Sequence, residues 1–392
     1  MSGYKYRTRK NTENFGGIMN KKKMLALLLA LVMVFALVAC GKNENETAGE
    51  KPGETATETA AEQTEGEKPA DSVKLDGKSV GMVTDTGGVN DESFNQSSWA
   101  GLNRLKDDTG AEVSYVQSEQ DADYIPNINQ LVDQNTDLVW GIGFLLADSI
   151  KTASQQSPDQ NFAIIDKEYE DAASLPNVTG VVFKAEQPSF AVGYIAGHTT
   201  KTNKVGFVGG VKGVVIDQFE FGYRAGVLEA AKELGKEIEV DIQYADSFDD
   251  EAKGKSIATR MFNDGSDIVF HAAGGVGKGV IEAAKEANKF AIGVDADQSG
   301  LAPKNVLTSA LKKVDIAVYD LSKRVLSGEK LGGQTVVYTV NEDAVGIPEH
   351  RGDDALYPLD LHEKAIQKLE DMKAGKINVP FNEAEWDKYI AE

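Results

Sequence analysis

The chain has 392 residues and a formal net charge of −21, with 41 Lys and Arg against 62 Asp and Glu. Such an acidic protein is poorly suited to binding nucleic acid or anionic membrane surfaces, and its length is enough for two domains. The single Cys excludes an intrachain disulfide, and the four His have no metal-ligand spacing, so we expect neither a metal nor a cofactor.

Residues 1–39 are expected to be an N-terminal extension followed by an export signal. Three lysines, Lys21 to Lys23, precede an uninterrupted apolar run from Met24 to Ala39. The run is short for a membrane span and typical of a signal peptide. We expect translation to start at Met19 rather than at Met1.

The signal ends in LVACG, from Leu37 to Gly41, which resembles the lipobox of bacterial lipoproteins. The resemblance implies that Cys40 is diacylated and becomes the new N-terminus, and two acyl chains suffice for stable membrane attachment. Residues 40–73 then hold the lipidated Cys and a tether, which is rich in Glu and Thr and has almost no large apolar residue to bury. We therefore expect a lipid-anchored protein on the extracytoplasmic face of the cell membrane.

From Lys74 onwards, apolar strands alternate with amphipathic helices, a pattern typical of βαβ units and parallel sheets. The strands fall into two successive series, which predict two lobes. The first series covers 79–84, 112–117, 138–143, 161–166 and 178–183, and the second covers 203–210, 239–245, 267–273, 290–297 and 306–311.

The stretch from Val80 to Leu105 is predicted to be a buried strand, a turn and a helix that starts near Ser93. Asp85, Asn90, Asp91 and Phe94 then gather at the carboxyl end of the first strand. In an open α/β sheet, ligands bind at that edge. The alternative is that Asp91 only caps the helix and that Phe94 packs in the core.

This stretch resembles the signature D-x-G-x-x-N-D-x-S-F-N-x-x-x-x-x-G of the basic membrane protein family of bacterial lipoproteins. These are substrate-binding proteins of ABC transporters and include the purine nucleoside receptors. The residues that match are Asp85, Gly87, Asn90, Asp91, Ser93, Phe94, Asn95 and Gly101.

The order of elements resembles the type I periplasmic-binding-protein fold, an α/β fold of two doubly wound lobes. In that fold the chain crosses three times between the lobes, and the ligand lies in the cleft. We place the crossings near 184–188, 309–312 and 339–345. The predicted N-terminal lobe comprises 74–185 plus 311–338, and the C-terminal lobe comprises 186–310 plus 339–392.

Other strand ends supply further candidates. Gly141, Gly143 and Phe144 follow one strand of the first series, and Asp166 ends the next, where it would otherwise cap a helix. In the second series we expect Phe219 and Phe221 to precede a helix. One of the two would pack inside, and the other would form an aromatic sandwich with Phe94. The family places a phenylalanine of this region on the purine, and by spacing we favour Phe219.

The segment GGVGKG, from Gly274 to Gly279, follows a strand and opens a helix. It is not a nucleotide-phosphate loop, because Lys278 is followed by Gly279 rather than by the hydroxyl residue that would hold Mg²⁺. The segment matches the glycine-rich loop of the family, which implies that Gly274 and Gly275 lie under a ribose.

Asp295 ends a strand, and a carboxylate there suits two vicinal hydroxyls. The family pattern T-S-x-x-K matches Thr308, Ser309 and Lys312, which implies a ligand role for Lys312, whereas Lys313 is expected to face solvent. Asp85, Asn90, Asp91 and Asp166 remain as candidates to read the polar edge of the base.

Together these features predict a monomeric solute-binding lipoprotein of an ABC importer, with a purine nucleoside as ligand and permease and ATPase subunits as partners. The predicted ligand-binding residues are Asp85, Asn90, Asp91, Phe94, Asn95, Gly143, Phe144, Asp166, Phe219, Gly274, Gly275, Asp295 and Lys312. We expect binding and hinge closure rather than catalysis. The alternatives are a ligand-sensing lipoprotein for a membrane receptor, a binding protein for another sugar-like solute, and an enzyme acting on nucleosides.

Overall fold

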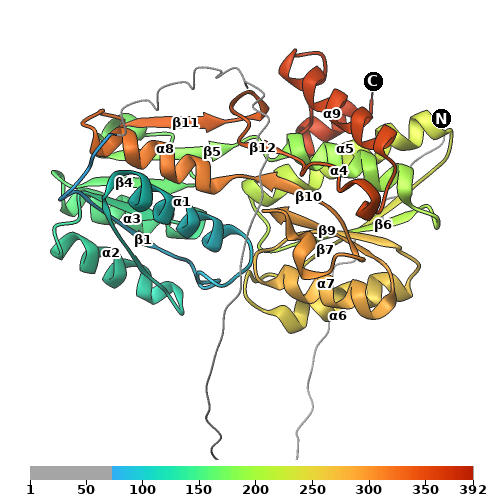
Figure 1. Ribbon diagram of the computed structural model, residues 1–392, viewed down its shortest axis with the longest axis horizontal. Coiled ribbons are helices and arrows are strands. Elements are labelled where there is room, and N and C mark those ends of the chain that lie inside the picture. Colours follow the sequence, from blue (N-terminus) through green and yellow to red (C-terminus); the bar gives the residue numbers. More distant parts are fainter. Residues whose placement is uncertain (1–72, 392) are drawn as a thin grey trace, which may run out of the picture. The chain divides into compact units, whose positions relative to one another are not determined.

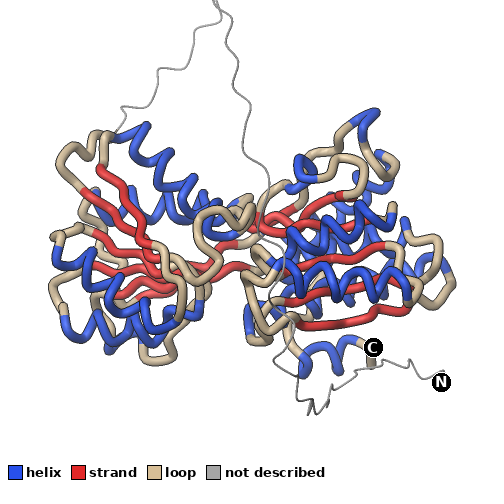
Figure 2. The backbone as a smooth tube through the Cα atoms, turned by 90° about the horizontal axis from the view of Figure 1, so that it is seen from below, coloured by secondary structure: helices blue, strands red, loops and turns tan. Residues whose placement is uncertain are grey.

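The computed structural model describes residues 73–391. The predicted signal, Cys40 and nearly all of the tether therefore lie outside the described residues. The described residues build two six-stranded sheets, each covered by helices (Figures 1 and 2). We refer to the two halves as the first lobe and the second lobe.

The sheet of the first lobe has the strand order β11-β5-β4-β3-β1-β2, and every pair in it is parallel. Its helices include α8, which returns from the second lobe and packs against α1. The strands are β1 (Ser79–Val83), β2 (Glu112–Val116), β3 (Leu138–Gly141), β4 (Asn161–Ile165), β5 (Val178–Phe183) and β11 (Gln334–Tyr338). The helices are α1 (Phe94–Thr109), α2 (Tyr124–Asp133), α3 (Ala147–Gln156) and α8 (Val314–Leu326).

The sheet of the second lobe has the order β12-β10-β9-β8-β6-β7 and is parallel except for β12, which is antiparallel to β10. The strands are β6 (Lys204–Gly209), β7 (Glu239–Tyr244), β8 (Ile268–Ala272), β9 (Phe290–Asp295), β10 (Val306–Lys312) and β12 (Val345–Gly346). The helices are α4 (Glu186–Thr199), α5 (Val214–Leu234), α6 (Glu251–Asn263), α7 (Val276–Ala287), α9 (Leu359–Lys373) and α10 (Glu383–Tyr389). This arrangement confirms the predicted two-lobed α/β fold.

The core of each lobe follows from its apolar central strands. Every residue of β3 and of β8 is buried, whereas the edge strand β2 has no buried residue. This is the pattern of a parallel sheet with helices on both faces. The buried indole of Trp140 on β3 donates a 2.9 Å hydrogen bond to Ser322 on α8, and this bond helps to fix the returning helix against the first sheet.

The second crossing between the lobes lies slightly later than the sequence predicts. Leu311 pairs with Gly346 and Lys312 with Val345, so β10 stays in the second sheet through Lys312. The chain leaves that sheet at Lys313, and α8 then begins in the first lobe at Val314. The pairing with β12 extends β10, and this short strand was not recognised from the sequence.

The start of α5 was also predicted wrongly. The helix begins at Val214, after Gly213, so Phe219 and Phe221 lie inside it rather than before it. The β-branched run of Val214, Val215 and Ile216 has low intrinsic helix propensity and hides the first turn. Tertiary packing overrides that propensity, because Ile216 is 5% exposed and Phe219 is 2% exposed.

Candidate functional site

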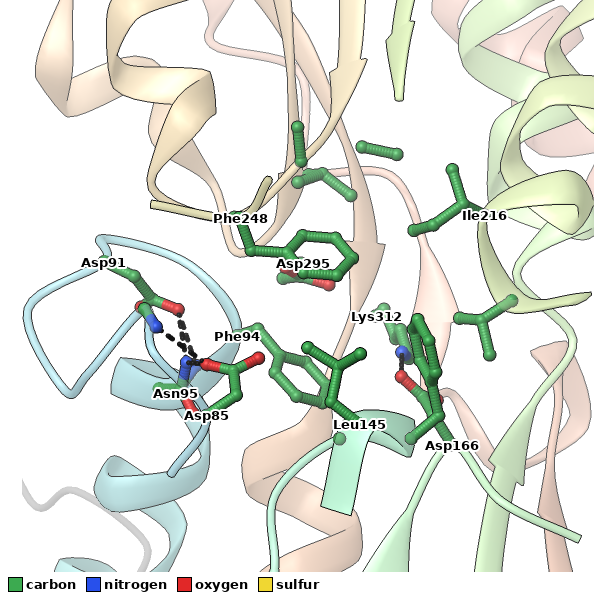
Figure 3. A pocket seen from close by; sticks show the side chains of 18 of the residues that line it. Asp85, Asp91, Phe94, Asn95, Leu145, Asp166, Ile216, Phe248, Asp295 and Lys312 are labelled. Atoms are coloured by element: carbon green, nitrogen blue, oxygen red, sulfur yellow. Dashed lines mark hydrogen bonds and ion pairs between the residues drawn. The ribbon is translucent and has the colours of Figure 1, made fainter. Parts of the chain in front are cut away.

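A pocket lies between the lobes, at the carboxyl ends of the parallel strands, where ligands bind in open α/β sheets. Both lobes contribute to its wall (Figure 3). The first lobe contributes Asp85, Gly87, Asp91, Phe94, Asn95, Gly143, Phe144, Leu145 and Asp166, and the second contributes Val215, Ile216, Phe219, Phe248, Ala272, Ala273, Gly274, Val294, Asp295 and Lys312.

Most of the residues predicted from the sequence meet in this pocket, including all of the predicted Asp, Phe and Lys side chains. Two predicted residues are not among those lining it. Asn90 is exposed, and its main-chain carbonyl accepts a hydrogen bond from Lys278 instead. Gly275 lies just beyond the pocket wall, since the loop turns into α7 at Val276, and only Gly274 reaches the wall.

Phenylalanine side chains from both lobes line the pocket. Phe94 begins α1 and is half-buried, and Phe219 comes from α5 of the other lobe. Phe221 instead packs on Trp386 of α10, with ring centroids 6.3 Å apart, so of the two candidates only Phe219 lines the pocket. The Nζ atom of Lys312 lies 4.8 Å from the ring centroid of Phe94 and 5.9 Å from that of Phe219.

The polar wall of the first lobe is a cluster of Asp85, Asp91 and Asn95 (Figure 3). Asp91 is 2% exposed and accepts from the main-chain N–H groups of Ser93, Asn95 and Gln96. It therefore holds the start of α1, as the capping alternative predicted, and these bonds leave little of its carboxylate for a ligand. Burial raises its pKa, and the hydrogen bonds oppose that rise.

Asn95 joins the two carboxylates. Its Nδ2 group lies 2.8 Å from Asp85 Oδ1 and 3.1 Å from Asp91 Oδ2. With the amide nitrogen used in this way, Asn95 Oδ1 is buried and has no hydrogen-bond partner among the described residues. A buried acceptor without a partner costs about 1–3 kcal/mol, so this atom suits a ligand that donates an N–H or O–H. Burial also raises the pKa of Asp85 to about 6.

Two aspartates occupy similar positions in the two lobes. Asp166 directly follows β4, and Asp295 is the last residue of β9; their φ angles are +65° and +63°. Residues other than glycine seldom adopt this conformation, although Asp and Asn do so more readily than most, and strained backbone of this kind clusters at functional sites. Both side chains face the pocket, so the uncommon backbone conformation coincides with the strand ends that form the cleft.

Each of these aspartates contacts the opposite lobe. Asp166 accepts from Lys312 Nζ at 2.5 Å, and both side chains are almost fully buried. Asp295 Oδ2 accepts from Ser93 Oγ of the first lobe, also at 2.5 Å. Burial raises the pKa of Asp295 to about 6, and Lys312 and Ser93 oppose that rise. The site thus offers carboxylate oxygens, one ammonium group and aromatic faces, a set suited to binding a flat ligand that carries hydroxyls.

Comparisons with known proteins identify the family. A family profile described as "ABC transporter substrate-binding protein PnrA-like" matches residues 78–383. The chain belongs to this family. The resemblance to the basic membrane proteins, which rested on the motif from Asp85 to Gly101, is thereby confirmed.

Individual relatives cover most of the chain. The CD4+ T-cell-stimulating antigen of Listeria innocua is 40% identical over 383 residues, which is 92% of this chain and 99% of that protein. The ABC transporter nucleoside-binding protein BmpA of Lactococcus lactis is 39% identical over 331 residues, which is 79% of this chain and 90% of that protein. The protein is thus a substrate-binding protein of the PnrA-like family of ABC transporter components.

The crystal structure of an ABC transporter system solute-binding protein from Aeropyrum pernix K1 has the same fold. It matches with a TM-score of 0.71 at 24% identity, covering 80% of this chain and 97% of that one. Between residues 73 and 391 no helix is long and apolar enough to cross a membrane, and no group of three His, Cys, Asp or Glu side chains is placed to hold a metal ion.

Several lining residues of this PnrA-like protein were not predicted from the sequence. Phe248 lies in the loop before α6, and its ring centroid is 6.1 Å from that of Phe144 in the other lobe. The sequence could have indicated Phe248, because it is an aromatic residue among polar neighbours in the segment DSFDD, directly after a strand. Leu145, Val215 and Ile216 carried no such signal, because apolar residues at helix starts are equally common in cores.

Proposed function

We propose that this substrate-binding protein is a membrane-tethered lipoprotein that captures a purine nucleoside between its lobes and delivers it to an ABC importer. The observation that carries the proposal is the pair Phe94 and Phe219, which line one pocket from opposite lobes. Stacking a base on an aromatic ring contributes about 1–3 kcal/mol for each base and needs no particular base identity. The larger ring of a purine offers more contact area.

Asp295 and Lys312 are the residues we propose for the ribose. A carboxylate accepts hydrogen bonds from two vicinal hydroxyls, and an ammonium group donates to their oxygens. Both side chains are buried, at 6% and 2% exposed, so a hydroxyl that meets them replaces no strong contact with water. Gly274, at the end of the loop before α7, lets the main chain approach the sugar without a side chain in between.

The polar edge of the base is proposed to meet Asn95 and Asp85. Asn95 Oδ1 lacks a partner among the described residues and can accept from a ring N–H or an exocyclic amine. Asp85 uses Oδ1 for Asn95 and for the main-chain N–H of Gly87, so Oδ2 is the carboxylate oxygen that we propose for the ligand. Unpaired polar groups of this kind discriminate between bases more strongly than contact area does.

The same proposal includes the anchor and the partners. Cys40 would carry the lipid, 41–73 would form the tether, and a permease with its ATPase would receive the ligand from the closed form. The membership of the PnrA-like family and the nucleoside-binding name of the Lactococcus lactis relative support this proposal. We expect a monomer, because each lobe contributes its half of the site within one chain.

A thermal-shift screen tests the proposal. A ligand that binds only the folded protein raises the melting temperature, by an amount that grows with its concentration relative to Kd. Purine nucleosides should raise it most, and free purines and free ribose should raise it little at the same concentration. A pentose that stabilises the protein as strongly as any nucleoside would instead indicate a sugar-binding protein.

A further inference from the structure

A loop of the first lobe contacts the second lobe at the edge of the pocket. Lys278 Nζ on α7 donates to the main-chain carbonyl of Asn90 at 3.2 Å. Gln298 Nε2 donates to the carbonyl of Glu92 at 2.9 Å. Together with the bond from Ser93 to Asp295, these contacts join residues 90–93 to the second lobe at three points. We call this set of six residues the clasp.

Gln298 holds its place in the clasp through bonds inside its own lobe. It is 3% exposed, and its Oε1 atom accepts from the main-chain N–H of Val294 at 3.0 Å. The same atom lies 2.9 Å from Nε2 of the fully buried His271. Because an amide oxygen only accepts, Nε2 of His271 carries the hydrogen. Both bonds fix the amide so that its NH₂ group faces the carbonyl of Glu92.

Gln298 and His271 are tightly packed against glycines of their own lobe. A Cβ atom on Gly293 would lie 2.7 Å from Gln298 Oε1, and one on Gly277 would lie 1.9 Å from the ring of His271. The other ring nitrogen of His271, Nδ1, is buried and has no hydrogen-bond partner among the described residues. Among residues 73–391, the imidazole therefore makes its one hydrogen bond to Gln298, and this bond orients the amide.

The loop of the first lobe, residues 90–93, is also fixed by hydrogen bonds within its own lobe. Asp91 accepts from the N–H groups of Ser93, Asn95 and Gln96, which ties the loop to the start of α1. Glu92 adopts a φ of +56°, an uncommon value for a residue with a side chain, and its side chain is exposed. The second lobe thus uses the carbonyls of Asn90 and Glu92, while the side chain of Asp91 keeps those carbonyls in place.

We infer that the clasp stabilises the closed arrangement of the lobes, in which residues 90–93 contact the second lobe, without any contribution from ligand. Gln298 is its main positioning residue. The inference rests on the proposed function only in that opening and closing of the lobes admit and release the solute. The contacts of Gln298 and Lys278 with the loop are direct bonds between protein atoms, because both acceptors are main-chain carbonyls. They therefore contribute to the contact between the lobes by themselves. With the clasp, more of the ligand-free protein is closed than without it, so the clasp slows both entry and release of the solute.

Gln298→Glu is the sharpest test variant. A carboxylate still accepts from Val294 and His271, but it places a second acceptor against the carbonyl of Glu92, so the contact between the lobes is the one that is lost. A buried hydrogen bond typically changes an equilibrium about 2- to 12-fold, and we expect the ratio of closed to open protein to fall by at least about 3-fold.

The ratio is measured without ligand by single-molecule energy transfer on the full chain. Dyes are attached at Gln134→Cys and Asn263→Cys, which are exposed positions on the two lobes, in a Cys40→Ser background. We expect a population at longer dye separation to increase in Gln298→Glu. An unchanged distribution in a variant that melts at the wild-type temperature would overturn the inference.

Lys278→Met provides a second variant if Gln298→Glu folds poorly. Lys278 is partly exposed and also pairs with Glu251 within its own lobe, so Glu251→Gln removes that pair and leaves the contact with Asn90. Lys255→Met, which breaks a similar pair with Glu286 on the same two helices, is the matched control. The inference requires more open protein in Lys278→Met and wild-type distributions in both other variants; equal distributions in all three would contradict it.

Binding kinetics separate a clasp from a general structural role. With inosine as probe, loss of the clasp should speed dissociation and also association, because more of the free protein is open. A residue needed only for folding would lower the active fraction without speeding association. If wild-type protein binds no nucleoside, the proposed function fails, but the ligand-free distributions still decide whether the clasp exists.

Discussion

Lys312 at the end of β10 and Asp166 after β4 form a buried ion pair across the two lobes, with Nζ and Oδ2 2.5 Å apart. The second sheet and the first sheet thus share a charge pair in the wall of the pocket between the lobes. Both side chains are almost fully buried, so each charge depends on its partner from the other lobe for compensation.

Lys312→Met should destabilise the protein by about 3–5 kcal/mol, because it leaves Asp166 buried without its counter-charge. The double variant Lys312→Met with Asp166→Asn should recover part of that loss. Urea unfolding of the single and double variants measures both values. A single variant as stable as wild type would show that Asp166 is solvated in solution and that the pair is not buried there.

Asp295→Ala should separate nucleosides from free bases. If Asp295 accepts from the ribose hydroxyls, its removal leaves these hydroxyls without an acceptor. The binding free energy of the nucleoside should then weaken by about 2–5 kcal/mol. A free purine lacks the sugar and should lose much less. Calorimetric titration with a nucleoside and with its base gives both losses, and equal losses would remove Asp295 from the ribose site.

The pKa values of Asp85 and Asp295, which burial raises from 3.8 to about 6, give opposite pH trends for stability and for binding. The folded state holds these protons more tightly than the unfolded state, so their contribution to stability is full below pH 3.8 and is lost as the pH rises through about 6. Ribose hydroxyls donate to the ionised carboxylate, so nucleoside affinity should rise through the same range and then level off.

Titrations at about pH 5 and about pH 8 test this trend. Asp295→Asn serves as the control, because its amide keeps the size of the side chain and does not ionise. It should remove the part of the pH dependence that comes from Asp295 and leave the part that comes from Asp85. A wild-type affinity that is equal at both pH values would indicate that Asp295 does not bind the ligand as a carboxylate.

Phe94→Ala should weaken every nucleoside by about 1–3 kcal/mol without changing their order of affinity, because stacking does not read exocyclic groups. Phe221→Leu, at the neighbouring phenylalanine that packs on Trp386, is the control for loss of an aromatic ring outside the pocket. If Phe94→Ala lowers the melting temperature but leaves affinity unchanged, Phe94 is a core residue and not a wall of the site.

Cys40→Ser should release the protein from membranes or leave its signal uncleaved, since the acyl chains have no sulfur to join. Ligand affinity should stay at the wild-type value, because Cys40 lies far along the chain from residues 78–383, which match the family. Mass spectrometry of the purified protein shows whether acyl chains are attached. Acyl chains found on the Ser variant would contradict the lipobox assignment.

The fold was accessible from the sequence because its strands are short apolar runs between clear turn signals. Strand ends also revealed much of the pocket: Asp166 and Asp295 could be placed there because parallel strands deliver their carboxyl ends to one edge. The start of α5 could not be placed, since Val214, Val215 and Ile216 are β-branched and the packing of Ile216 and Phe219 that fixes the helix appears only in the folded chain.

Roles within the pocket were harder to predict than positions. Nothing in the residue pattern distinguishes an aspartate that meets a ligand from one that caps a helix, and Asp91 proved to bind the N–H groups of α1. Gln298 was not recognised at all, because its importance depends on Val294, His271 and Glu92, which only the folded chain brings together.

Isothermal titration of purine nucleosides into protein freed of any co-purified ligand tests the central claim most directly. We predict saturable binding of one nucleoside per chain, weakened by Phe94→Ala and by Asp295→Ala in the ways described above. Absence of binding by every purine nucleoside, with clear binding of an unrelated solute by the same preparation, would contradict the account.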